Sequence, residues 1–177
     1  MIIDLKEITK EILSKISNDI FVYPTDTIYG IGCDAENEKL VYKIRKIKNR
    51  DQKPLSIIAP SKRYILENFI ADDKKIDKYL PGQYTLILKK KKLDYLKHVS
   101  ENEFVGIRIP AHPFTKIIQE LNKPIVTTSV NLSGEKPANK ISEINPRILK
   151  QIPILIDDGE LSGIPSILIK DNKEIKR

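Results

Sequence analysis

The segment "KIKNRDQKPLSII", residues 46–58, joins a helix to a buried strand, and this junction sets the class of fold. A helix leads into the segment, as the apolar residues at helical spacing before and within it predict: Leu40, Ile44 and Ile47. That helix must end before Pro54, because a proline disfavours the helical conformation of the residue that precedes it. The apolar run at residues 55–59 then has the length of a buried strand. A helix therefore passes into a strand through a junction that carries four cations and one acid, Asp51.

The same alternation continues along the chain and predicts an α/β fold with a twisted mixed sheet and flanking helices. Helices are expected at residues 5–16, 40–47, 62–69, 74–80 and 113–121, and strands at 20–23, 55–59, 84–88, 105–109, 125–128, 154–156 and 167–169. With 177 residues, of which 40% are hydrophobic, the chain can bury one core, so a single domain over residues 1–177 is expected. The lysine run at residues 89–92 follows a predicted strand, and we interpret it as a solvated strand end that guards a sheet edge.

The composition narrows the classes of partner and location. The chain has 31 basic and 24 acidic residues, and the net charge of +7 favours anionic partners such as nucleotides, nucleic acid or acidic lipid. A solvated, lysine-rich surface explains most of these lysines equally well. Cys33 is the single cysteine and cannot form an internal disulfide, and the chain starts without an apolar stretch of signal-peptide length. A cytoplasmic protein is therefore expected, and no apolar run approaches the roughly 20 residues of a membrane span.

Polar residues follow predicted strands in three loops, and ligands of open α/β sheets gather at the carboxyl ends of strands. The first loop, "YPTDTIYGIGCDA" at residues 23–35, offers the side chains of Thr25, Asp26, Thr27 and Tyr29 between glycines. It carries neither a Walker A pattern nor a complete dinucleotide fingerprint. A glycine-rich turn with local hydrogen bonds explains this loop as well as a ligand site does.

The second loop holds Lys48 and Arg50, which would project to the same side of an extended segment because they are two residues apart. A lysine point charge beside an arginine fork would form a phosphate clamp. The alternative is a basic helix end that complements the helix dipole. It fits Lys46 and Lys48 better than Arg50 and Lys53.

The third loop, "TTSVNLSGEKPAN" at residues 127–139, places the hydroxyl of Ser129 two residues before the amide of Asn131. Such a pair is suited to orienting a small polar substrate and phosphate oxygens. An Asx or Ser/Thr turn that leads into a helix remains an equal explanation.

The three loops, together with "PGQYTLIL" at residues 81–88 and "GIRIPAHP" at residues 106–113, resemble the YrdC-like family of L-threonylcarbamoyladenylate synthases from about residue 20 onward. The resemblance implies a concave, basic cleft on the sheet and a nucleotidyltransferase that makes threonylcarbamoyl-AMP and pyrophosphate from L-threonine, bicarbonate or CO2, and ATP. Partner proteins would then transfer the group to the adenosine beside the anticodon of tRNA. Whether tRNA also binds directly is left open by the sequence.

The resemblance also implies which residues form the site. The catalytic set would be Lys48, Arg50, Ser129 and Asn131; the L-threonine set would be Thr27, Arg108, Ser129 and Ser166; the nucleotide set would be Lys48, Arg50, Asn131, Asn139 and Arg177. Charge develops on phosphate oxygens in this reaction, and Lys, Arg and Mg²⁺ are suitable stabilisers. Mg²⁺ is expected to accompany ATP without a dedicated protein site. His112 is expected to be structural, since no partner ligands lie at metal spacing.

Two features depart from the family pattern. Three residues separate Arg50 from Pro54, where the family commonly has four, so Lys53 could take over a contact. Ile167 follows Ser166 where the family usually has threonine, so a hydroxyl is lost.

Two rival functions remain open on the sequence. One is a double-stranded RNA or tRNA-binding module that uses the basic cleft as a groove, and its binding would fall steeply with salt. The other is a carbamoyl-transfer relative. Its larger chains carry zinc-finger-like cysteine clusters, which a chain with one cysteine lacks.

Overall fold

The structure, a computed structural model, describes residues 1–50 and 53–175. The strands are β1 (Ile2–Asp4), β2 (Phe21–Tyr23), β3 (Gly30–Gly32), β4 (Ser56–Ile58), β5 (Phe69–Ile70), β6 (Tyr84–Lys90), β7 (Phe104–Arg108), β8 (Ile125–Ser129), β9 (Ile154–Asp157), β10 (Ile167–Lys170) and β11 (Lys173–Ile175). The helices are α1 (Lys10–Asn18), α2 (Glu38–Lys48), α3 (Lys62–Asn68), α4 (Asp73–Tyr79), α5 (Phe114–Leu121) and α6 (Pro146–Leu149), with 3-10 turns at Leu5–Glu7 and Ile141–Glu143.

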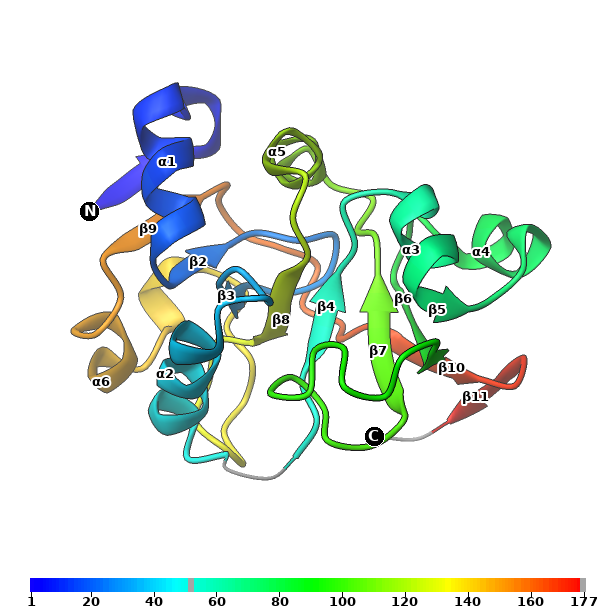
Figure 1. Ribbon diagram of the computed structural model, residues 1–177. Coiled ribbons are helices and arrows are strands. Elements are labelled where there is room, and N and C mark those ends of the chain that lie inside the picture. The colour runs from blue at the N-terminus through cyan, green and yellow to red at the C-terminus, as the bar shows by residue number, and fades with distance from the viewer. Residues whose placement is uncertain (51–52, 176–177) are drawn as a thin grey trace.

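All eleven strands of the described residues belong to one twisted mixed sheet, as expected for the α/β class (Figure 1). The strand order is β1-β9-β2-β3-β8-β4-β7-β6-β10-β11, and β5 pairs with β6 beside this path. Strands β1 and β2 run parallel to β9, β4 runs parallel to β7, and β6 runs parallel to β10. The remaining pairs are antiparallel, including β4 with β8 and β6 with β7.

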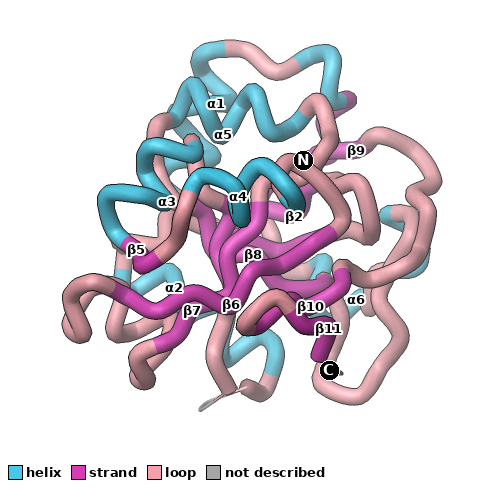
Figure 2. Tube along the Cα trace, turned by 90° about the vertical axis from the view of Figure 1, so that its right-hand side faces the viewer, coloured by secondary structure: helices cyan, strands magenta, loops and turns pink. Residues whose placement is uncertain are grey.

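Apolar side chains cover both faces of the sheet, because successive residues of a strand point to opposite faces. In β4, Ile57 belongs to the larger core cluster and Ile58 to the smaller one. The smaller cluster includes residues of α1 and α5, which lie together on one side of the sheet in both views (Figure 1, Figure 2). The larger cluster includes residues of α2, α3, α4 and α6.

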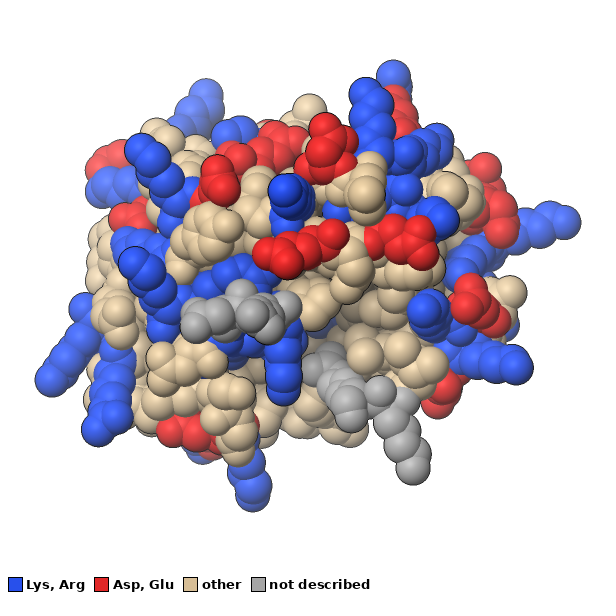
Figure 3. Space-filling view, turned by 60° about the horizontal axis from the view of Figure 1, so that its bottom comes forward, with Lys and Arg blue, Asp and Glu red and all other residues tan. Residues whose placement is uncertain are grey.

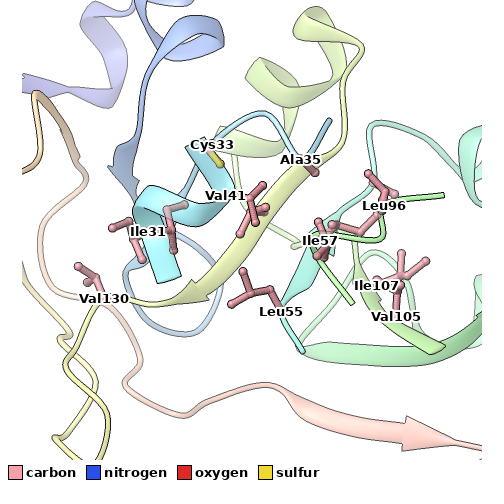
Figure 4. Packing of buried hydrophobic residues seen from close by; sticks show 14 of the residues in the cluster. Ile31, Cys33, Ala35, Val41, Leu55, Ile57, Leu96, Val105, Ile107 and Val130 are labelled. Carbon is pink, nitrogen blue, oxygen red and sulfur yellow. The ribbon is translucent and has the colours of Figure 1, made fainter. Parts of the chain in front are cut away.

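The larger cluster packs α2 against the middle of the sheet (Figure 4). Val41 of α2 points toward Ile31 of β3 and toward Leu55, which directly precedes β4. All three side chains are buried. A fully buried side chain of this kind stabilises the fold by roughly 1.5–3 kcal/mol. This packing fixes the end of α2 relative to β4.

The N-terminal prediction of one helix over residues 5–16 is wrong in its start. The chain first adds β1 to the edge of the sheet, where Ile3 pairs with Ile156 and is buried. The helix begins only at Lys10, because the Thr9 hydroxyl accepts a hydrogen bond from the backbone N–H of Ile12 at 3.4 Å and caps it.

Strand β3 was not expected, because Gly30 and Gly32 have low strand propensity. The structure shows why a glycine stands there. A Cβ built on Gly32 would lie 2.3 Å from the backbone oxygen of Val126 in the neighbouring strand. Strands β5 and β11 and helix α6 were also missed, since each spans only two to four residues.

The prediction that the lysine run at residues 89–92 is solvated is wrong for Lys90. Strand β6 continues to Lys90, whose side chain turns inward and donates hydrogen bonds to the carbonyls of Leu93 at 2.8 Å and Ser100 at 3.0 Å. Its neighbour Lys89 is exposed and pairs with Glu103 at 2.6 Å. Lys90 therefore anchors the loop that follows β6.

None of the helices in the described part of the chain combines the length and apolar character that crossing a membrane requires.

Candidate functional site

A cleft of about 680 Å³ opens on the face of the sheet that α1 and α5 cover farther along. Its floor is formed by β4, β7, β6 and β10, which contribute Ser56, Gly106, Ile87 and Leu168. The wall of the cleft is formed by the loop before β3, the end of α2 and the loop after β8.

The expectation that the site lies at the carboxyl ends of strands is only partly right. Ser129 ends β8, but Ser56 begins β4 and Phe104 begins β7. The reason is the mixed topology, because β8 runs antiparallel to β4 and so brings its carboxyl end to the start of β4.

The cleft is basic. Among the described residues its lining includes the cationic side chains Lys48, Arg50, Lys53, Arg108 and Lys170 and no acidic one. Figure 3 brings the lower side of Figure 1 forward and shows many Lys and Arg side chains there, with acidic side chains in smaller groups. The expected concave, basic cleft is confirmed, and its lining favours an anionic ligand.

Lys48 is the last residue of α2, so the helix-end alternative holds for Lys48, and Lys48 and Arg50 do not lie on one extended segment. Asn49 takes the left-handed conformation with φ 49° and ends the helix, and the backbone N–H of Arg50 bonds to the Arg45 carbonyl at 3.0 Å. The chain reverses at Asn49, and both Lys48 and Arg50 still line the cleft.

The ammonium group of Lys48 joins two of the expected motifs. It donates to the carbonyl of Ser129, to the carbonyl of Asn131 at 2.7 Å and to Asn131 Oδ1 at 3.3 Å. The Lys48 residue is only 2% exposed. Burial, with a smaller contribution from the nearby charge of Arg50, lowers the pKa of Lys48 to about 7, although the charge of Glu135 opposes the shift. A bound polyphosphate would favour the ammonium form.

The side chain of Asn131 has a fixed orientation. Its Nδ2 donates to the carbonyls of Leu132 at 3.1 Å and Glu135 at 2.6 Å, whereas its Oδ1 accepts from the Ser129 hydroxyl at 2.5 Å. These contacts differ from the Asx turn that the sequence left as an alternative, because Asn131 Oδ1 accepts from the Ser129 hydroxyl and the Lys48 ammonium and not from a backbone N–H.

Arg108 and Thr27 also line the cleft. The Arg108 guanidinium donates to Asp26 Oδ1 at 2.5 Å and to the Thr27 hydroxyl at 3.2 Å, and the residue is 5% exposed. Asp26 Oδ2 also accepts the backbone N–H of Ala111 at 2.9 Å. Arg108 Nε is buried and has no hydrogen-bond partner among the described residues.

Ser166 lies beside Thr85, with 2.8 Å between their hydroxyl oxygens. A Cβ built on Gly106 would lie 2.3 Å from Ser56 Oγ, so the Ser56 side chain lies directly against the backbone of Gly106 in the floor of the cleft. Sequence reasoning missed Ser56 and Thr85. A polar residue inside the otherwise apolar strand 84–88 was the available signal for Thr85.

The structure thus brings seven of the nine predicted site residues to one cleft: Thr27, Lys48, Arg50, Arg108, Ser129, Asn131 and Ser166. Asn139 is not among the lining residues. Its backbone N–H bonds to Glu143 Oε2 at 2.9 Å, and its side chain lies against Gly163. Arg177 lies outside the described residues. Lys53, the expected substitute contact, does line the cleft.

His112 is half-buried and packs into the structure. Its Nε2 lies 3.1 Å from Asp158 Oδ2, and its Nδ1 accepts the backbone N–H of Phe114 at 3.2 Å. Within residues 1–50 and 53–175, no three His, Cys, Asp or Glu side chains gather in a way that could hold a metal ion.

The fold and the cleft define an α/β protein whose concave sheet face presents convergent cations and hydroxyls to an anionic ligand. The model of the Sua5/YciO/YrdC family, described as telomere recombination, matches residues 16–176. The chain belongs to this family.

Curated relatives match over most of their length. A Methanocaldococcus jannaschii relative is 41% identical over 172 residues, which cover 94% of this chain and 79% of the relative. A threonylcarbamoyl-AMP synthase of Pseudoalteromonas atlantica is 34% identical over 160 residues, which cover 86% of this chain and 84% of that enzyme.

Solved structures agree with the fold. P. abyssi Sua5 complexed with L-threonine superposes with a TM-score of 0.80 at 25% identity over 96% of this chain, which spans 54% of Sua5. E. coli YciO superposes with a TM-score of 0.78 at 23% identity over 99% of this chain and 92% of YciO, which supports the fold alone.

Proposed function

We propose that this chain is an L-threonylcarbamoyl-AMP synthase that converts L-threonine, bicarbonate or CO2, and ATP to threonylcarbamoyl-AMP and pyrophosphate. One observation carries the proposal: the Lys48–Arg50 pair and the Ser129–Asn131 pair, which lie about 80 residues apart in sequence, meet through Lys48 in one basic cleft. The curated names of relatives such as the P. atlantica enzyme support it.

The chemistry asks for what this cleft offers. An oxygen of the threonine carbamate attacks the α-phosphorus of ATP, an O–P bond forms, and the bond from that phosphorus to the bridging oxygen of pyrophosphate breaks. Negative charge grows on the phosphate oxygens and on the leaving pyrophosphate. Lys48 and Arg50 would stabilise that charge, and because they are held in place before the substrate arrives, little reorganisation is required.

Arg108 and its neighbours are proposed to hold L-threonine. Arg108 lines the cleft, where its guanidinium could donate to the threonine carboxylate, and the Thr27, Ser129 and Ser166 hydroxyls line the same cleft. The threonine complex of P. abyssi Sua5 supports an amino-acid site in this fold.

Mg²⁺ is proposed to arrive with ATP as part of the substrate. The described lining of the cleft has cations and no carboxylate, so the phosphates of ATP would be the ligands that hold the ion. Its chemistry would be to neutralise charge on the β- and γ-phosphates.

The rival reading, an RNA-binding groove, is less well supported. Lys48 and Arg108 are 2% and 5% exposed, so their charges face the interior of a small cleft and not a duplex backbone. The product is proposed to pass to proteins that transfer the threonylcarbamoyl group to tRNA, and direct binding of tRNA is the least supported part of this proposal.

The deciding experiment measures pyrophosphate release from ATP. Release should require both L-threonine and bicarbonate, and threonylcarbamoyl-AMP should appear in equal amount by mass spectrometry. Release that is independent of threonine, or the absence of release together with tight, salt-sensitive RNA binding, would refute the proposal in favour of the rival reading.

A further inference from the structure

The turn that carries Asn131 is closed by a side chain outside the cleft, Glu135. The backbone N–H of Glu135 bonds to the Leu132 carbonyl at 3.1 Å, and its carboxylate accepts the backbone N–H of Leu132 at 3.3 Å. The same residue's carbonyl accepts Asn131 Nδ2 at 2.6 Å. Residues 131–135, here called the 131–135 turn, therefore form a ring of hydrogen bonds around Glu135.

Glu135 also ties this turn to the next helix. Its Oε1 accepts a hydrogen bond from Asn145 Nδ2 at 2.9 Å. Asn145 precedes α6, and its own Oδ1 accepts the backbone N–H of Arg147 at 3.0 Å. The two carboxylate oxygens thus have separate partners, one inside the turn and one at the start of α6.

The 131–135 turn affects Lys48 through the side chain of Asn131. With Nδ2 engaged by the turn, Asn131 Oδ1 can only face the Ser129 hydroxyl and the Lys48 ammonium. The Asn131 carbonyl, the other end of the same residue, also accepts from Lys48. The position of the Lys48 ammonium therefore depends on the shape of the 131–135 turn.

We propose that Glu135 is a positioning residue for the nucleotidyl-transfer reaction: its carboxylate fixes the 131–135 turn, which orients the Asn131 amide and the Lys48 ammonium. Glu135 does not line the cleft and would not touch the substrates. The catalytic part of this inference rests on the proposed function. The geometric part, that Glu135 controls the surroundings of Lys48, does not.

The charge of Glu135 also stabilises the Lys48 ammonium, in addition to the effect of Glu135 on the shape of the 131–135 turn. Two charged groups act on the Lys48 ammonium: Arg50, just beyond the helix end, lowers its pKa, and Glu135, on the turn, raises it. Removal of the Glu135 charge should therefore lower the Lys48 pKa further, so that the ammonium form is lost at a lower pH.

The test compares Glu135→Gln, which keeps the shape and removes the charge, with Glu135→Asp, which keeps the charge and shortens the reach. Glu120→Gln, an equal charge change on the exposed face of α5, is the matched control. Three quantities are measured for each: the Lys48 titration midpoint by NMR of labelled lysine side chains, kcat and KM for pyrophosphate release, and Tm.

Glu135→Gln should lower the Lys48 midpoint, and both Glu135 variants should reduce kcat by about tenfold to a hundredfold, the range expected for a misplaced catalytic group. KM for threonine should change less than kcat, and Glu120→Gln should match the wild type.

An unchanged Lys48 midpoint in Glu135→Gln together with kcat within twofold in both variants would overturn the proposal. A shifted midpoint in a protein without synthase activity would instead sustain the geometric part and refute the proposed function. A drop in Tm with unaltered kcat at permissive temperature would show a purely structural role and also overturn it.

Discussion

Lys48 is expected to act on turnover because it lies where the triphosphate would bind. Lys48→Ala and Arg50→Ala should each lower kcat by about 10² to 10³, the effect typical of a lost electrostatic donor. Steady-state kinetics of pyrophosphate release measure this. Lys46→Ala is the matched control, since Lys46 is exposed in the last turn of the same helix and its removal should leave kcat unchanged. Equal losses in all three variants, or full activity of the first two, would contradict the assignment.

The burial of Lys48 predicts that ATP binding takes up a proton. The pKa of Lys48 is lowered to about 7 in the free protein, so above that pH the amine is largely neutral. ATP phosphates favour the ammonium form and raise this pKa, so affinity for ATP should decrease as the pH rises above about 7. Calorimetry at pH 8 in buffers of different ionisation enthalpy would detect the uptake. An identical apparent enthalpy in all buffers would contradict it.

Replacement of Arg108 should weaken the binding of L-threonine more than the binding of ATP. Its removal alone would leave the buried Asp26 carboxylate unpaired, which typically costs about 3–5 kcal/mol in stability, so the informative variant is the double change Arg108→Gln with Asp26→Asn. This variant should raise KM for threonine well above the wild-type value and leave KM for ATP nearly unchanged, because a charge-assisted contact to a carboxylate is lost. A selective defect in ATP binding would reassign the residue, and Asp26→Asn alone controls for the loss of the ion pair.

Among the secondary-structure elements, the loop after β6 depends on one lysine. Lys90→Ala removes two hydrogen bonds from a buried cation to carbonyls and should lower the free energy of unfolding by about 2–4 kcal/mol. Lys92→Ala, an exposed neighbour in the same run, should change stability by less than about 0.5 kcal/mol. Urea unfolding of both variants measures the difference. Equal stability of the two would mean that Lys90 does not anchor the loop.

The sequence predicted those elements whose apolar pattern reports burial directly. The Val-, Leu- and Ile-rich runs that became β4, β6, β7, β8 and β9 were found, because each buries consecutive apolar side chains on both faces of the sheet. The strand β3 could not be found this way, since Gly32 is there for a close contact with the Val126 carbonyl and has no side chain to reveal it. Lys90 was misjudged for a related reason: composition shows a lysine but not which way it points.

The site was predicted through ordered motifs, and the structure explains where that reasoning stopped. Lys48 and Ser129 could be paired only by the resemblance, because the contact between them spans 81 residues and two elements. The left-handed Asn49 could not be foreseen, so the sequence left open whether Lys48 and Arg50 lie on an extended segment or at a helix end. Thr85 and Ser56 entered the cleft through the register of β4, β7 and β6, which no local pattern encodes.

For the molecule as a whole, ligand binding should stabilise the native state by mass action. A ligand at 100 times its dissociation constant that binds only the folded chain adds about 2.7 kcal/mol. ATP with Mg²⁺ should therefore raise Tm by several degrees, and L-threonine with bicarbonate should raise it further. Differential scanning fluorimetry measures both shifts, with Lys48→Ala as the control that should lose most of the ATP effect. No shift at saturating ATP would show that the cleft does not bind it.

The strand order also determines when the sheet can form while the chain is being synthesised. Ile2 pairs with Leu155, so β1 has no partner strand until β9 is made, whereas β2 can pair at once with β3 and only its other edge waits for β9. At a ribosomal rate of about 5–20 residues per second, β1 remains without its partner for roughly 8–30 s. Such remote pairings slow folding and leave sheet edges unprotected in the meantime. The cleft, whose walls extend from Thr25 to Lys170, is thus among the last features of the nascent chain to form.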